Sequence, residues 1–211
     1  MNVLVVTAHH DDLELGCGGT IAKLHDGANR LISLVLTNSE YRGPDKAIIR
    51  TKEAALKEGA LASQILGYEL MSFDEDTFDI PVSDYNIVRI LELIDKYKID
   101  TVFTHWHGDT HPPHRRVHRM VLHACRHIPR VLGFAVNWYL GEQAFSPNFF
   151  VSIEESYWER KIQALQCYKS EFKRAGKTMV EYLNNQTLNH GIQIGVRRAQ
   201  GFVAYKYLWD V

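Results

Sequence analysis

Short apolar runs alternate with amphipathic segments along most of the chain. The apolar runs, rich in valine, isoleucine and leucine, predict strands buried on both faces, and they cover residues 2–7, 31–36, 68–73, 100–104, 131–137, 148–153 and 201–208. Apolar positions at helical spacing predict helices between them, over residues 18–26, 45–66, 85–98, 113–128, 154–169 and 179–190.

This alternation predicts the α/β class. Strands that alternate with helices form a mostly parallel sheet covered on both faces, and no repeat or linker interrupts the pattern. A chain of 211 residues is long enough for one well-buried core and short for two. We therefore expect one domain over residues 1–211, a Rossmann-like three-layer sandwich.

Composition narrows the function classes. The chain is 45% hydrophobic and 23% charged, with a net charge of −1, so it carries no basic footprint for nucleic acid. No apolar run approaches the ~18 residues of a membrane span, and the start at Met1 lacks the basic region of a signal peptide. Cys17, Cys125 and Cys167 lack CxxC spacing. We expect a cytoplasmic protein with no nucleic-acid partner and no membrane span.

The densest group of ionisable residues follows the first predicted strand. It places His9, His10, Asp11, Asp12 and Glu14 within six positions, where a buried strand ends and a helix begins. Ionised carboxylates beside a core are tolerated when they are paired, hydrogen-bonded or bound to a metal. Imidazole with carboxylate is a ligand set that suits zinc and its neighbours, so this stretch predicts a metal site.

Two other interpretations explain part of the same stretch. A helix N-cap accounts for one aspartate, but it does not require two histidines ahead of two aspartates. Glycines 16, 18 and 19 after the first strand suggest a nucleotide-binding Rossmann protein. The GxGxxG pattern is absent, because Ile21 stands three positions after Gly18, and the acidic run repels a pyrophosphate. The metal site is the favoured interpretation.

A second group follows the fourth predicted strand. Five of the eleven histidines lie between His105 and His118. Loops that leave neighbouring strand ends of a doubly wound sheet converge on one crevice, so we expect the two groups to meet. His9, Asp12 and one histidine of the second group give three protein ligands and an open position, which is the pattern of a catalytic zinc.

These motifs resemble those of the PIG-L/LmbE-like de-N-acetylases, which remove an acetyl group from N-acetylglucosamine-type amides. The family's first motif, Ala-His-Pro-Asp-Asp with Glu and Gly nearby, is similar to residues 8–12 with Glu14. Its second motif is a histidine and a glycine-aspartate that lead into His-x-Asp-His. The similar positions here are His105, Gly108, Asp109, His111 and His114.

The resemblance implies a role for each matched residue. It implies that His9, Asp12 and His114 hold Zn²⁺ or another divalent metal, that Asp11 is the general base, and that His111 is the catalytic histidine. General chemistry agrees, because a metal-activated water needs a carboxylate to take its proton, and a tetrahedral intermediate needs a partner for its oxyanion.

Four further residues are candidates for substrate binding. Arg50 and Arg42 are candidates to hold a substrate hydroxyl or phosphate, and the Arg50-x-x-Glu53 pair is also similar to the family. His105 and Asp109 lie in the second motif and are expected to line the pocket.

Two positions depart from the family pattern. His10 replaces a proline, which changes loop stiffness more than chemistry, and Pro113 replaces the aspartate that partners the catalytic histidine in the family. Loss of that aspartate removes a charge that favours imidazolium. The predicted protein is a zinc-dependent hydrolase that removes an acetyl group from an N-acetylated amino sugar or its conjugate, as a possible homo-oligomer. Pro113 leaves open a non-catalytic metal-binding relative.

Overall fold

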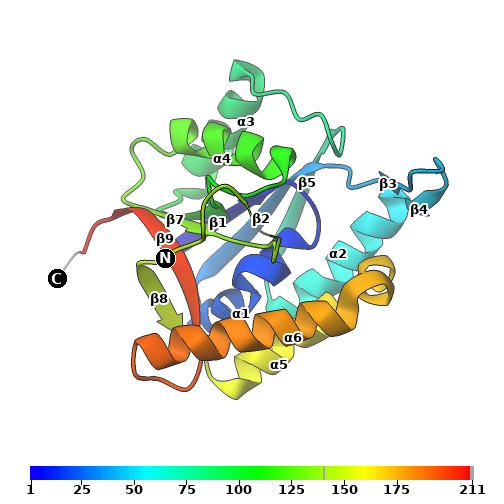
Figure 1. Cartoon of the computed structure of the whole chain (residues 1–211). Helices are drawn as coiled ribbons and strands as arrows, with labels where there is room; N and C mark the ends of the chain where they lie inside the picture. The colour runs from blue at the N-terminus through cyan, green and yellow to red at the C-terminus, as the bar shows by residue number, and fades with distance from the viewer. Residues whose placement is uncertain (140, 210–211) are drawn as a thin grey trace.

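A seven-stranded sheet lies between two layers of helices (Figure 1). The computed structural model describes residues 1–139 and 141–209. In this part of the chain the strand order of the sheet is β5-β2-β1-β6-β7-β9-β8, and β9 alone runs antiparallel to its neighbours. The strands are β1 (Asn2–Thr7), β2 (Arg30–Thr37), β5 (Glu69–Glu75), β6 (Thr101–His105), β7 (Arg130–Phe134), β8 (Phe149–Ser152) and β9 (Ala199–Tyr207). The predicted α/β class and mostly parallel sheet are confirmed.

The helices are divided between the two faces of this sheet (Figure 1). They are α1 (Asp12–Asp26), α2 (Lys52–Leu66), α3 (Asp84–Tyr97), α4 (Pro112–Ala124), α5 (Glu155–Leu165) and α6 (Lys169–Gln193). Side chains of α3 and α4 pack on one face, and those of α1, α2 and α5 pack on the other. Helix α6 packs against β9 and α5, and its Met179 and Leu183 share a buried cluster with Trp158 and Leu165.

Alternate residues of β1 enter the two cores. Val3 and Val5 belong to the core beneath α1 and α2, and Leu4 and Val6 belong to the core beneath α3 and α4. Both sets are fully buried. A strand covered on both faces reads as an unbroken apolar run, which is why the sequence pattern located β1 correctly.

The direction of winding changes between β1 and β6. β1 pairs in parallel with β2 on one side and with β6 on the other, with Val6 opposite Thr104. Ligands of open α/β sheets bind outside the carboxyl ends of the strands at such a switch point. The segments that follow Thr7 and His105 therefore leave the sheet side by side.

The prediction that the first helix begins near Gly18 is wrong. Helix α1 begins at Asp12, and its first turn is closed by the backbone N–H of Leu15, which donates to the carbonyl of Asp11 at 3.0 Å. The glycines lie inside the helix, where glycine propensity is poor. They are retained because α1 packs closely: a Cβ added at Gly16 lies 2.1 Å from the ring of Phe134.

The predicted helix over residues 45–66 begins too early. Thr51 caps α2 by accepting from the N–H of Ala54, and residues 48–50 pair instead as β4 (Ile48–Arg50) with β3 (Tyr41–Arg42). Ile48 and Ile49 are exposed. Their apolar side chains fit the spacing of a helix face, which is why the predicted helix was too long. The helix begins after Thr51 because the Thr51 side chain caps it.

The segment after residue 165 also differs from its prediction. Helix α5 ends at Leu165 and α6 runs from Lys169 to Gln193, whereas the sequence predicted helices over 154–169 and 179–190.

Among the described residues, no helix combines the length and the apolarity that a membrane span requires.

Gly16→Ala is expected to destabilise the fold by about 1–3 kcal/mol, because the new methyl group overpacks a core in which Phe134 is fully buried. Denaturant unfolding measures this loss. Gly27→Ala is the control, since Gly27 has φ −80 and an added Cβ there meets only the Asn29 side chain at 3.1 Å and backbone at 3.4 Å or beyond. Equal stability of both variants would contradict the packing role of Gly16.

Candidate active site

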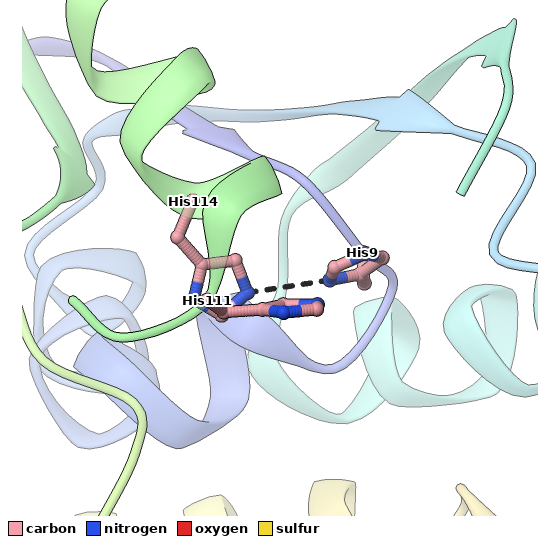
Figure 2. A group of neighbouring side chains, drawn as sticks. All are labelled: His9, His111 and His114. Atoms are coloured by element: carbon pink, nitrogen blue, oxygen red, sulfur yellow. Dashed lines mark hydrogen bonds between the residues drawn. The ribbon is translucent and has the colours of Figure 1, made fainter. Parts of the chain in front are cut away.

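Two segments that are far apart in the sequence meet at the switch point. The segment after β1 carries His9, Asp11 and Asp12, and the start of α4 carries His111 and His114. His111 is the N-cap of α4, and prolines occupy the first positions of the helix, where a missing N–H is tolerated. Figure 2 shows the three imidazoles pointing toward one another.

Three potential ligand groups, the two imidazoles and both oxygens of the Asp12 carboxylate, form a compact triangle. His9 Nδ1 lies 3.3 Å from His114 Nε2 and 3.5 Å from Asp12 Oδ2, and Asp12 Oδ1 lies 3.3 Å from His114 Nε2. Atoms bound to one tetrahedral zinc at about 2.0–2.1 Å are about 3.3 Å apart. The spacing therefore fits a single metal ion.

The polar contacts behind the two histidines support this fit. His9 Nε2 lies 3.2 Å from the carbonyl of Thr77, and His114 Nδ1 lies 3.0 Å from Asp109 Oδ2. With a proton on each of these nitrogens, the other nitrogen of each ring faces the triangle and is able to bind a metal ion once it carries no proton itself. Two lone pairs and a carboxylate 3.3–3.5 Å apart repel one another unless a cation lies between them.

The electrostatics of the site also favour a cation. Burial raises the pKa of Asp12, but His114, His105 and His9 hold it well below its usual range. Burial lowers the pKa of His114, but the carboxylates of Asp12 and Asp109 overcome this and raise it to about 10. The carboxylates thus favour positive charge at His114 Nε2, which either a proton or a metal ion supplies.

His105 lies behind the triangle. Its ring is fully buried and stacks on His114, with centroids 3.9 Å apart and planes 4° apart. His105 Nε2 lies 3.1 Å from Asp12 Oδ2, but it accepts the backbone N–H of Ala8 at 3.1 Å, so its lone pair is already used. Among the described residues, two groups have potential ligand atoms within 4.8 Å of one another, His9–His111–His114 and Asp12–His105–His114. The hydrogen bond from Ala8 makes His105 the weaker ligand of the second group.

The side chain of Asp109 holds the residues of the second motif in place. Its Oδ1 accepts the backbone N–H of His111 at 2.8 Å and the side-chain amide of Asn137 at 2.7 Å, and its Oδ2 faces His114. The Asp109 carboxylate is therefore committed to the backbone and to His114, and not to the ring of His111.

Asp11 lies beside Arg50 at the edge of the triangle. Burial raises the pKa of Asp11 to about 6, against the opposing effect of Arg50; the charges of Asp12 and Glu171 raise it further. Arg50 Nη1 is 3.7 Å from Asp11 Oδ2, while its Nε donates to the carbonyl of Ser39 at 3.0 Å. Arg50 is thus anchored in the protein with one nitrogen turned to Asp11.

The ring of His111 lies close to the rings of two other histidines. Its centroid lies 4.7 Å from that of His114 and 5.2 Å from that of His9, and its nitrogen is within ligand reach of both. Burial lowers the pKa of His111 to about 4, and the charges of His114 and His9 lower it further. His111 is therefore largely neutral near pH 7, chiefly because its ring is buried.

A cavity of about 330 Å³ opens onto these groups. It is lined by His9, Asp11, Asp12, His111 and His114, with Arg50. Arg42 is not among the lining residues: its half-exposed side chain pairs with Glu40 at 2.8 Å. His105 and Asp109 also lie outside this lining, behind the ligand triangle.

Glu14 of the first motif points elsewhere. Its fully buried carboxylate accepts the hydroxyls of Tyr68 at 2.6 Å and Tyr168 at 3.2 Å. Burial raises the pKa of Glu14 to about 7, although the Tyr68 and Tyr168 hydrogen bonds oppose this. Glu14 therefore ties α1 to its neighbours and does not line the cavity.

The structure adds residues that the sequence analysis missed. Asn137, Glu171 and Arg174 line the same cavity. Asn137 stands at the end of the predicted strand 131–137, so its position at a strand's carboxyl end was a usable signal. Glu171 and Arg174 lie on α6, and no motif in the sequence marks them.

The nucleotide-binding alternative does not fit this geometry. Gly16, Gly18 and Gly19 lie inside α1 and form no phosphate loop. The N-terminus of α1, where a pyrophosphate would bind, is occupied by Asp11 and Asp12.

An α/β sheet with a His/Asp triangle at its switch point defines a protein whose side chains could hold a metal ion, with a further carboxylate beside them. The match to known families is specific: residues 4–125 match the PIG-L model, described as GlcNAc-PI de-N-acetylase. The chain belongs to this family, and the matched segment contains both motifs. The chain is accordingly an enzyme that hydrolyses N-acetyl groups.

Two relatives agree with this assignment. YaiS of Escherichia coli K12, described as an uncharacterized deacetylase, is 31% identical over 179 residues, which are 80% of this chain and 90% of that protein. The diacetylchitobiose deacetylase of Thermococcus kodakarensis is 27% identical over 220 residues, covering 94% of this chain and 81% of the relative.

A solved structure shows the breadth of the fold. The 4-carboxy-2-hydroxymuconate hydratase GalB of Pseudomonas putida KT2440 superposes with a TM-score of 0.84 at 20% identity, over 100% of this chain and 99% of that one. The fold is therefore shared with an enzyme of another class, and the argument for function depends on the side chains of the site.

Proposed function

We propose that the protein is a zinc-dependent deacetylase that hydrolyses the acetamide of an N-acetylated amino sugar or its conjugate. The observation that carries this proposal is the convergence of the His9–Asp12–His114 triangle, the Asp11 carboxylate and the His111 imidazole on one cavity. The curated relatives in the family supply the sugar substrate class, because one of them is named for diacetylchitobiose.

His9, Asp12 and His114 are proposed to hold the metal. When bound, a divalent ion supplies Lewis acidity for the acyl oxygen and lowers the pKa of a water molecule. Zinc suits two imidazoles and one carboxylate with an open position, and Asp109 fixes His114 from behind, as outer-sphere partners of metal ligands do.

Asp11 and His111 are proposed to move and stabilise charge. Asp11 accepts a proton from the attacking water as the new C–O bond forms, and Arg50 keeps the carboxylate in place. His111 donates an N–H to the oxyanion of the tetrahedral intermediate. The proton on Asp11 then passes to the departing nitrogen as the C–N bond breaks, giving acetate and a free amine.

Acetate release tests the proposal. The metal-loaded protein is incubated with N-acetylglucosamine and with N,N′-diacetylchitobiose, and acetate and free amine are quantified. We expect both products in equal amounts, loss of turnover after chelation, and recovery when Zn²⁺ is returned. A metal-loaded protein that releases no acetate from either compound would favour the non-catalytic relative that Pro113 leaves open.

Pro113→Asp is expected to raise turnover and to extend it toward higher pH. The pKa of His111 lies at about 4, so imidazolium is scarce near neutral pH, and a new carboxylate raises that pKa because it stabilises the charged form. An acidic residue in the first turn of α4 also suits the helix dipole. pH–rate profiles of both proteins measure the change.

The variant is compared with wild type only after metal content and thermal unfolding are matched. An unchanged alkaline limb in a folded, metal-loaded variant would contradict the view that His111 lacks a carboxylate partner.

A further inference from the structure

One wall of the cavity is formed by α6, outside the segment that matches the family model. Glu171 and Arg174 lie there, one turn apart, and both line the cavity. Arg174 donates to Glu171 Oε2 from Nη2 at 2.5 Å and from Nε at 3.2 Å. The Glu171 side chain is 18% exposed and that of Arg174 is 53% exposed, so the carboxylate is the inner member of the pair.

Each arginine of the cavity is matched by a carboxylate. Arg50 faces Asp11 at 3.7 Å, and Arg174 is bound by Glu171. Guanidinium groups are the usual readers of phosphate and carboxylate, and a guanidinium already paired with an acid has less charge to offer. The two arginines alone predict a site for an anionic substrate, but their partners counter this prediction.

Glu171 also has bonding capacity left for a ligand. Both hydrogen bonds from Arg174 go to Oε2, and no hydrogen bond to Oε1 is found within residues 1–139 and 141–209. A free carboxylate oxygen accepts a hydrogen bond from a hydroxyl group and repels a phosphate. The pair therefore suits the hydroxyls of an uncharged sugar.

We infer that Glu171 is a specificity-determining residue that masks the charge of Arg174, so that the site takes an uncharged N-acetyl amino sugar in preference to a phosphorylated one. The inference rests on the proposed function and extends it to the charge of the substrate. Since Arg174 is half exposed, it is able to turn to a substrate phosphate once its partner is neutral.

The test compares N-acetylglucosamine with N-acetylglucosamine 6-phosphate. In Glu171→Gln the ratio of kcat/KM for the phosphorylated over the uncharged sugar is expected to rise about tenfold, because one negative charge is lost beside the ligand. Glu181→Gln is the matched control: it removes the same charge from an exposed position of α6 that does not line the cavity. Its ratio is expected to stay at the wild-type value.

A double variant separates masking from simple repulsion. In Glu171→Gln/Arg174→Gln most of the gain is expected to disappear, since the unmasked guanidinium is gone. Equal ratios in Glu171→Gln and Glu181→Gln, or full retention of the gain in the double variant, would overturn the inference.

The same ratio is measured by calorimetry as a ratio of dissociation constants on the metal-loaded protein, which requires no turnover. A protein that binds both sugars but releases no acetate overturns the proposed function alone, and the binding ratios still decide the inference about Glu171.

Discussion

Asp11→Asn is expected to lower turnover about 10²- to 10⁴-fold while the metal content stays at the wild-type level. The amide keeps the shape of the carboxylate but accepts no proton from water. Asp11 Oδ2 is 3.7 Å from Arg50, and Asp11 is not a member of either group of potential ligands found in the described residues. Steady-state kinetics and elemental analysis of the same sample measure both quantities.

Asp12→Asn is the matched control, since it makes the same chemical change at the neighbouring position. Asp12 lies within 3.3–3.5 Å of the ligand nitrogens of His9 and His114, so this variant is expected to lose metal together with turnover. If both variants lost metal to the same extent, the assignment of Asp11 as base and Asp12 as ligand would be wrong.

The sequence was sufficient to predict that the two groups of ionisable residues meet. Val3 to Val6 and the run before His105 are buried on both faces of the sheet, and such strands leave a clear apolar signal. Ionisable residues directly after two such strands converge because parallel strands end at one edge. His9 and His114, 105 positions apart, meet at 3.3 Å for this reason.

The start of α1 was harder to predict. Asp12 and Glu14 are polar, and Gly16 and Gly18 are poor helix formers, so a later start was favoured. Tertiary contacts override that preference: Gln200 accepts the N–H of Thr20 at 2.6 Å and donates to the carbonyl of Gly16 at 3.3 Å. These two groups are four residues apart in the helix, and their partner lies in β9, which no local pattern reveals.

The cavity residues on α6 could not be predicted from the sequence, for a related reason. Glu171 and Arg174 are an ordinary i, i+3 pair, which in a sequence indicates a solvated helix face. Their proposed role depends on where α6 packs, and its packing against β9 and α5 determines this. Residues that act through their place on a packed helix leave no motif, whereas residues at strand ends do.

His114→Ala is expected to reduce metal content from about one ion per chain to near zero and to abolish turnover. The change removes one of three proposed ligands, and loss of an outer partner alone costs about 10–100-fold in metal affinity, so loss of a ligand weakens binding further. His118→Ala is the control, because it removes another buried imidazole from α4, one whose Nδ1 lies 2.9 Å from the carbonyl of His105. Elemental analysis after gel filtration is expected to show metal retained in His118→Ala and lost in His114→Ala. Full metal occupancy in both variants would exclude His114 as a ligand and would shift the metal toward the nitrogens of His9 and His111.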